Sequence, residues 1–273
     1  MHNRNAFINS AGVVYFEFGN NGQSDIYLWR PEEPWGATVF SSDYQETIRT
    51  MMPDGGIVFS TKGLVGEDEL FYFRRGHGPF TICGDLPGPI QNHDMRYVTH
   101  TSQSLVVVES EGGSKDLWMW SPLGLNSKAI ANSSADECFE SLTPGEQVVY
   151  RTETAPGNND LRVYHYTTDS TRDIGTSLDN EVFEAVLPNS DVVFAVESSL
   201  GRELYRFDVV SGQTELIAGG VGESYSLAAV LGNGQVVYHQ GGVAGGTMLW
   251  NPSNGKSAVV AGPGSQFGGD CGD

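Results

Sequence analysis

Basic residues are scarce in this sequence. Its 273 residues include 15 Lys and Arg against 34 Asp and Glu, which gives a formal net charge of −19 at pH 7. Binding to nucleic acid needs clustered Lys and Arg, so we expect no nucleic-acid partner, and an anionic membrane surface is excluded on the same ground. The acidity fits simple solubility, or it serves a cationic ligand or a metal ion.

Cysteines and long apolar runs are also few. Cys83, Cys138 and Cys271 are an odd number without C-x-x-C spacing, so we expect neither a disulfide framework nor a zinc site. No run approaches the ~18 apolar residues of a transmembrane helix, which predicts no membrane insertion. No signal peptide precedes the first strand-like segment. The compartment stays open, with a periplasmic or secreted location favoured over the cytoplasm, and we expect a monomer.

Familiar catalytic motifs are missing from the chain. It contains no G-x-S-x-G, no H-E-x-x-H, no P-loop and no EF-hand loop. The Gly-rich stretch at 241–246 lies between strand-like runs and opens no helix, so it is interpreted as a turn rather than a phosphate cradle. These motifs therefore do not decide whether the protein is an enzyme.

What the sequence does contain is a repeat. An apolar triplet such as V-V-Y or I-V-F recurs, and the last residues of successive copies are 44, 47, 44, 44 and 44 positions apart. The residue that opens each D-I-Y-L-W-like run recurs after 44, 47, 44, 43 and 44 positions. Two landmarks thus indicate six units of about 44 residues. The triplet landmarks are Tyr15, Phe59, Val106, Tyr150, Phe194 and Tyr238.

Each unit contains four strand-like runs joined by links of hairpin length, and no segment has a helical period over ten or more residues. In the fifth unit the runs are 181–187, 191–198, 202–209 and 214–219. A repeat of 40–50 residues with four antiparallel strands is typical of a propeller blade. The sequence therefore predicts an all-β chain that forms a six-bladed β-propeller with four antiparallel strands per blade.

The fifth unit, "LPNSDVVFAVESSLGRELYRFDVVSG" at 187–212, resembles the TolB-like propeller repeat. Unit four, "LTPGEQVVYRTETAPGNNDLRVY", and unit two, "MPDGGIVFSTKGLVGEDELFYF", match it less fully. Units one, three and six replace its proline by Asn9, His100 and Gly232. The resemblance covers about 260 residues at the level of the repeat. It implies a six-bladed fold, and it transfers no activity because this fold hosts scaffolds, lectins, lyases and hydrolases.

The period predicts a single propeller at 1–261, followed by a flexible Gly-rich tail at 262–273. The expected blades are 1–41, 42–85, 86–132, 133–177, 178–220 and 221–261.

Polar residues recur at fixed distances from the triplet landmark. Thirteen positions before it stand His2, Glu46, His93, Glu137, Glu181 and Tyr225. Ten positions before it stand Asn5, Arg49, Arg96, Glu140, Glu184 and Ala228. Three positions after it, in units three to five, stand Glu109, Glu153 and Glu197. Since the first strand of a propeller blade lines the channel, we expect these residues to surround the channel and its mouth.

Two interpretations of these residues stay open. In the first, the charges neutralise each other, with Arg49 and Arg96 facing Glu140 and Glu184 across the channel, because buried carboxylates need partners. In the second, a divalent metal such as Ca²⁺, Mn²⁺, Fe²⁺ or Zn²⁺ is bound, since carboxylate and imidazole suit these ions. The predicted ligands of that metal are Glu46, His93, Glu137 and Glu181.

The functional prediction follows from the fold and the missing motifs. We expect a non-catalytic propeller that binds a protein, peptide or glycan at its loop-bearing face and channel mouth. The alternative is a metal-dependent enzyme, of the polysaccharide lyase or hydrolase type, with its His/Glu site at the channel mouth.

Overall fold

The computed structural model describes residues 2–9, 12–19, 23–62, 68–82, 98–101, 106–111, 114–121, 126–175, 177–242 and 245–262. Every regular element within these ranges is a β-strand, so the predicted all-β class is confirmed. In this part of the chain, no helix is long and apolar enough to cross a bilayer. The predicted tail lies outside the described residues from 263 onwards, as do Cys83 and Cys271.

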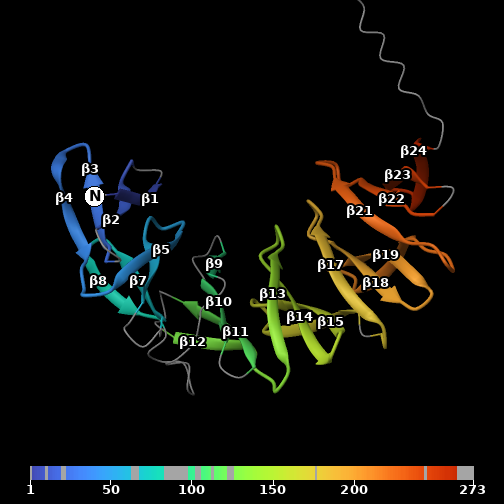
Figure 1. Ribbon diagram of the computed structural model, residues 1–273, viewed down its shortest axis with the longest axis horizontal. Coiled ribbons are helices and arrows are strands. Elements are labelled where there is room, and N and C mark those ends of the chain that lie inside the picture. Colours follow the sequence, from blue (N-terminus) through green and yellow to red (C-terminus); the bar gives the residue numbers. More distant parts are fainter. Residues whose placement is uncertain are drawn as a thin grey trace, which may run out of the picture. The chain divides into compact units, whose positions relative to one another are not determined.

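The described strands form six antiparallel sheets of four strands, and in each sheet the strands lie side by side in chain order (Figure 1). The chain divides into two compact units, Met1–Cys138 and Phe139–Asp273. The first unit contains β1 (His2–Ile8), β2 (Val14–Gly19), β3 (Asp25–Arg30), β4 (Glu33–Phe40), β5 (Gln45–Met51), β6 (Ile57–Lys62), β7 (Asp68–Arg74), β8 (His77–Thr81), β9 (Val98–His100), β10 (Val106–Glu111), β11 (Lys115–Ser121) and β12 (Asn126–Ala131).

The strand β13 (Asp136–Leu142) spans the boundary and opens the first sheet of the second unit. The other strands of this unit are β14 (Val148–Ala155), β15 (Asn158–His165), β16 (Ser170–Gly175), β17 (Asn180–Val186), β18 (Val192–Ser198), β19 (Gly201–Asp208), β20 (Gln213–Ala218), β21 (Tyr225–Val230), β22 (Val236–Gln240), β23 (Gly246–Asn251) and β24 (Lys256–Ala261). Each triplet landmark lies in the second strand of its sheet, so one sequence repeat builds one sheet.

The hydrophobic core of each unit lies between neighbouring sheets. Phe194 and Phe207 of the sheet β17–β20 pack against Val149 and Leu161 of the preceding sheet. The opposite face of the same sheet, including Leu204, packs against the following sheet, and further cores join neighbouring sheets in the first unit. Alternate residues of a strand point to opposite faces, which is why a single sheet contributes to two cores. Each buried large apolar side chain stabilises the fold by roughly 1.5–3 kcal/mol.

The same β-bulge recurs between the third and fourth strands of several sheets. Ile174 and Ile217 are the extra, unpaired residues of these bulges in β16 and β20. Both side chains are buried in the core between their own sheet and the next one. Val260 has the same place in β24, the last strand, yet it is 53% exposed. Among the described residues of its unit, none therefore covers Val260 on the outer face of the last sheet.

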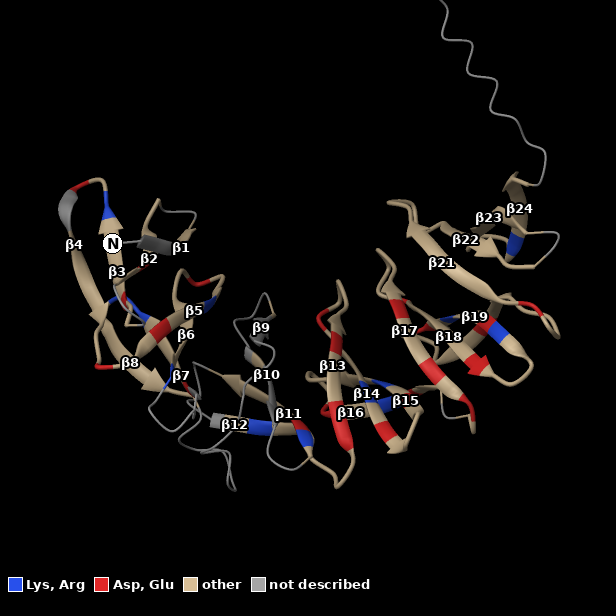
Figure 2. Ribbon diagram, viewed as in Figure 1, with Lys and Arg blue, Asp and Glu red and all other residues tan. Residues whose placement is uncertain are grey.

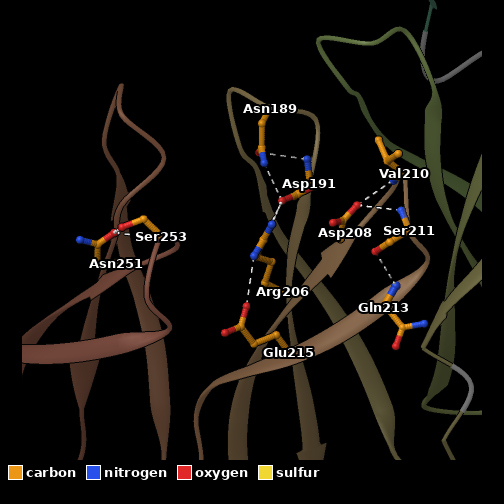
Figure 3. A network of polar contacts seen from close by, with 10 residues as sticks. All are labelled: Asn189, Asp191, Arg206, Asp208, Val210, Ser211, Gln213, Glu215, Asn251 and Ser253. Atoms are coloured by element: carbon orange, nitrogen blue, oxygen red, sulfur yellow. Dashed lines mark hydrogen bonds and ion pairs between the residues drawn. The ribbon is translucent and has the colours of Figure 1, made fainter.

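A polar network joins the hairpin between β17 and β18 to the strands beside it (Figure 3). The guanidinium of Arg206 on β19 donates to Asp191 through Nε and Nη2, each at 2.6 Å, and Nη1 lies 3.1 Å from Glu215 on β20. Asn189 donates to the same Asp191 carboxylate at 2.7 Å. The guanidinium also lies over Trp250 of the next sheet, 5.9 Å from the ring centre. One arginine thus holds a turn, two strands and a neighbouring sheet.

Candidate functional site

The first strands β5, β13 and β17 each have a buried glutamate as their second residue. Glu46, Glu137 and Glu181 are at most 1% exposed. A serine four residues earlier donates its hydroxyl to each of these carboxylates. The pairs are Ser42 with Glu46, Ser133 with Glu137, and Ser177 with Glu181. Each serine hydroxyl also accepts the amide two residues later at 3.1 Å, so the glutamate anchors the turn that enters its own strand.

The second oxygen differs among these three glutamates. Ser133 N lies 3.3 Å from both oxygens of Glu137. In contrast, Oε2 of Glu46 and Oε2 of Glu181 are buried without a hydrogen-bond partner. Burial raises the pKa of Glu46 to about 7, and the neighbouring Asp25 carboxylate adds to the increase. Burial likewise raises the pKa of Glu181, with a contribution from Asp160.

This arrangement bears on the predicted metal ligands. The described residues contain no group of three or more His, Cys, Asp or Glu side chains that could hold a metal ion. Glu46, Glu137 and Glu181 each serve the turn of their own strand, and His93 lies outside the described residues. The four-residue ligand set stays a prediction.

The residues predicted ten positions before the landmark have a distinctive place in the sheet. In β5, Ile48 pairs with Phe59 and Thr50 with Val58, so Arg49 between them is the unpaired residue of a bulge. In β17 the unpaired residue is Glu184, and in β21 it is Ala228. A bulge turns its extra side chain away from the regular alternation of the strand. The sequence spacing thus selected a position that is structurally special in these three strands.

Glu184 and Glu197 are brought together by a residue that the sequence interpretation missed. Arg202 on β19 pairs with Glu184 through Nη2 and with Glu197 through Nε at 2.9 Å. Its Nη1 donates to the carbonyl of Tyr225 in the next sheet at 2.6 Å. Asn180 donates to the other Glu197 oxygen at 3.1 Å. The two carboxylates and one guanidinium leave this cluster with a net charge of −1 when all three are ionised.

A sequence signal for Arg202 exists. Arg202 directly precedes Glu203, the landmark residue of the third strand in its unit. In two other units, the residue before the landmark also makes a hydrogen bond to the next sheet. Ser24 donates its hydroxyl to the Glu46 carbonyl at 2.7 Å, and Asn159 donates to Asn180 at 2.8 Å. The position before the landmark is therefore a recurrent polar link between sheets.

The remaining predicted residues are spread over several sheets. Glu140 on β13 pairs with Arg151 on β14 at 3.1 Å, and Glu184 pairs with Arg202 of its own sheet. The expected pairing of these glutamates with Arg49 and Arg96 stays a prediction. Arg49 donates to Ser60 at 2.9 Å. Glu153 is exposed and accepts the Gly157 amide at 3.3 Å. Arg96 lies outside the described residues, and of Glu109 only the backbone, in β10, is described.

Two first strands of the second unit, β13 and β17, each carry two or more acidic residues. Figure 2 shows Asp and Glu along β13 and β17. Their opposite ends are apolar and surround a pocket of about 420 Å³, lined by Leu142, Pro144, Val186, Leu187, Pro188, Val230, Leu231 and Gly232. The strands β13 and β17 thus pass from an acidic beginning to an apolar end, and the end of β21 lines the same pocket.

Comparisons with known proteins show the kind of fold. No family model and no curated protein matches the sequence. Among solved structures, dipeptidyl peptidase 4 from Porphyromonas gingivalis is similar with a TM-score of 0.64 and 12% identity, over 94% of this chain and 45% of that one. A puromycin hydrolase is similar with a TM-score of 0.49 and 15% identity, over 96% of this chain and 47% of that one. TolB from Acinetobacter baumannii is similar with a TM-score of 0.43 and 13% identity, over 90% of this chain and 62% of that one. The chain therefore spans less than half of the peptidase it resembles.

The likeness to dipeptidyl peptidase 4 shows a propeller-type fold and corrects the functional prediction. We expected a non-catalytic ligand- or protein-binding propeller, or else a metal-dependent lyase or hydrolase. A structure that is similar over 94% of the chain is instead that of a peptidase, and this finding contradicts the predicted function.

Proposed function

We propose that the sheets close into a six-bladed β-propeller of the TolB-like kind. The repeat of six sequence units and the likeness to a propeller-containing peptidase support it. The exposed Val260 is a further argument, since Ile174 and Ile217 at the same position are covered by a following sheet. The first sheet has an apolar outer face too, with Phe18 and Trp29 more than a third exposed. The first and the last sheet thus each have an exposed apolar face, and packing of these two faces would close the ring.

We further propose a peptidase-type function, in which this chain is the propeller part of the protein. The observation that carries the proposal is the similarity to dipeptidyl peptidase 4 over 94% of the chain. The chain contains no G-x-S-x-G motif, so the catalytic nucleophile would come from outside it. Its own contribution would be to admit and hold the peptide, and a periplasmic or secreted location stays a prediction.

The acidic cluster of Glu184, Glu197 and Arg202 is the part of the chain best suited to hold a peptide. Glu197 is 44% exposed at its side chain, whereas Glu184 is 15% exposed. Because the cluster carries a net charge of −1, it would attract a positively charged group such as the amine of a peptide. Carboxylates accept charge-assisted hydrogen bonds from ammonium groups, which are stronger than those between neutral partners.

The test is hydrolysis of short peptides by the purified full-length protein that carries this chain. We expect cleavage, and we expect Glu184→Gln with Glu197→Gln to raise KM about tenfold for peptides with a free amine, while kcat changes little. Peptides with an acetylated amine are the control substrates, and Glu32→Gln, an exposed carboxylate elsewhere, is the control variant. Absence of hydrolysis for every peptide would overturn the proposal. Hydrolysis with an unchanged KM in the double glutamine variant would show that the cluster does not hold the peptide.

A further inference from the structure

Three hairpins of the second unit have the same backbone hydrogen bonds. In each, the residue after the first strand donates its amide to the carbonyl four positions later, and its own carbonyl accepts the amide three positions later. These residues are Thr143 after β13, Leu187 after β17 and Leu231 after β21. Because the three hairpins are built alike, their sequences can be compared position by position.

The hairpin between β21 and β22 lacks two side chains that the others have. Where the first two hairpins have Pro144 and Pro188, the third has Gly232. Two positions further, Ser190 of the second hairpin corresponds to Gly234 of the third, with φ of 77° and 81°. The Ser190 hydroxyl accepts an amide of the neighbouring hairpin at 2.8 Å, and a glycine has no side chain for such a link. The third hairpin therefore leaves space beside the second.

Two pockets meet in this space. The pocket of about 420 Å³ at the ends of β13, β17 and β21 and a second pocket of about 310 Å³ share Leu187, Pro188 and Gly232. All residues that line the first pocket are apolar or glycine, and the second pocket adds the side-chain amides of Asn189 and Asn233. Mostly apolar hollows of about 300–1,000 Å³ with a few polar groups are typical of ligand sites. We call the two joined pockets the hairpin groove.

The hairpin groove lies on the same strands as the acidic cluster of Glu184, Glu197 and Arg202. On β17, Glu184 is two positions before Val186, which lines the groove. Arg202 contacts the Tyr225 carbonyl at the start of β21, and the end of this strand lines the groove. A strand rises about 3.3 Å per residue, so roughly 7–17 Å separate cluster and groove, which an extended peptide spans with about two to five residues.

We propose that the hairpin groove binds an apolar side chain of a peptide whose amine is held by Glu184 and Glu197. The inference rests on the function proposed above and names the substrate class, which is peptides with a free amine and an apolar residue at about positions three to six. Burial of a Phe or Leu side chain tightens binding by about ten- to hundredfold. A charged side chain would lose its water in the groove without gaining a partner there.

Peptide binding to the purified full-length protein tests the inference without the use of hydrolysis. Hexapeptides of Gly and Ser carry a free amine, a dye at the carboxyl end and one Phe, which is moved from position two to position six. Fluorescence anisotropy, read directly after mixing at 4 °C, gives Kd. We expect Phe at the best position to lower Kd about tenfold or more relative to the peptide without Phe. The best position should lie between three and six, and Phe at position two should give little gain.

Gly232→Leu is the variant that fills the groove. A Cβ at Gly232 would have no neighbour within 4 Å among the described residues, apart from those next to it in the chain, so the leucine enters open space. Gly78→Leu is the matched control, because Gly78 on β8 has equally open surroundings in the other unit. Only Gly232→Leu should raise the Kd of the best Phe peptide to that of the peptide without Phe. If Gly232→Leu does not fold, Gly232→Pro, which restores the residue of the other two hairpins, takes its place.

The outcomes separate the groove from the peptidase function. Equal Kd values with and without Phe, or equal losses in the Gly232→Leu and Gly78→Leu proteins, would overturn the groove. A gain from Phe that is the same at every position would overturn the assignment of amine and side chain to one bound peptide. If no peptide is hydrolysed, the peptidase function fails, whereas a Phe preference that Gly232→Leu abolishes still supports the groove.

Discussion

At the scale of single residues, Arg202 shows how much one side chain does in this fold. It contacts two carboxylates of its own sheet and a backbone carbonyl of the next. Glu184, its more buried partner, sits at a bulge on the first strand. Removing the guanidinium would leave that carboxylate enclosed without its positive partner, and such losses cost several kcal/mol where the pair is buried.

We therefore predict that Arg202→Met lowers the free energy of unfolding by about 2–4 kcal/mol. Arg151→Met is the matched control, because Arg151 is 43% exposed and its pair with Glu140 is solvated. That variant should lose less than about 1 kcal/mol. Urea denaturation of the three proteins at one pH measures the difference, and equal losses would show that the Arg202 contacts carry no special weight.

At the scale of strands and turns, the hairpin between β17 and β18 depends on Arg206. Its partner Asp191 is 3% exposed at the side chain, whereas its other partner Glu215 is 42% exposed. The two ion pairs of one arginine should therefore differ in strength, since burial limits screening by solvent.

We predict that a double-mutant cycle with Arg206→Met and Asp191→Asn gives a coupling energy of about 1–3 kcal/mol. The cycle with Arg206→Met and Glu215→Gln should give less than about 0.5 kcal/mol. Thermal or urea unfolding of the single and double variants measures both energies. If the exposed pair couples as strongly as the buried one, the network in Figure 3 is not organised by burial.

The strands and turns are the part of the structure that the sequence predicted best. Apolar triplets and turn residues predicted the strands because period-two patterning and hairpin links are local properties. The repeated Ser-x-x-x-Glu of "SDYQE", "SSADE" and "SLDNE" is also present in the sequence. Metal binding by these glutamates was one of two interpretations, and their role as anchors of their own turns was found only in the structure. The contact of Arg202 with Glu184 could not be predicted, because the two residues lie 18 positions apart and the contact depends on a bulge.

At the scale of the whole molecule, β1 is the element on which the proposed ring depends. It is the first strand of the sheet β1–β4. One face of this sheet packs against the second sheet through Tyr15, Ile26 and Leu28. Ile8 at its end is 67% exposed. If the first and last sheets close the ring by packing, loss of this strand removes an inner strand of one blade and weakens the closure at the same time.

We predict that deletion of residues 1–8 lowers the melting temperature by more than about 8 °C, because well over 1–2 kcal/mol is lost. Deletion of residues 263–273 is the control and should change it by less than about 2 °C. Differential scanning calorimetry measures both. A small effect of the first deletion would argue against the inner-strand assignment and against closure through the first sheet.

Arg49, Glu184 and Ala228 are the unpaired residues of bulges in their strands. This position affects which amino-acid substitutions the fold tolerates. An unpaired residue contributes no rung to the ladder of backbone hydrogen bonds, so cation, anion and methyl group all occur there without disturbing the strand. Side-chain chemistry and backbone pairing are thereby separated: the residue at this position can change from sheet to sheet, while the pairing of the strands stays constant.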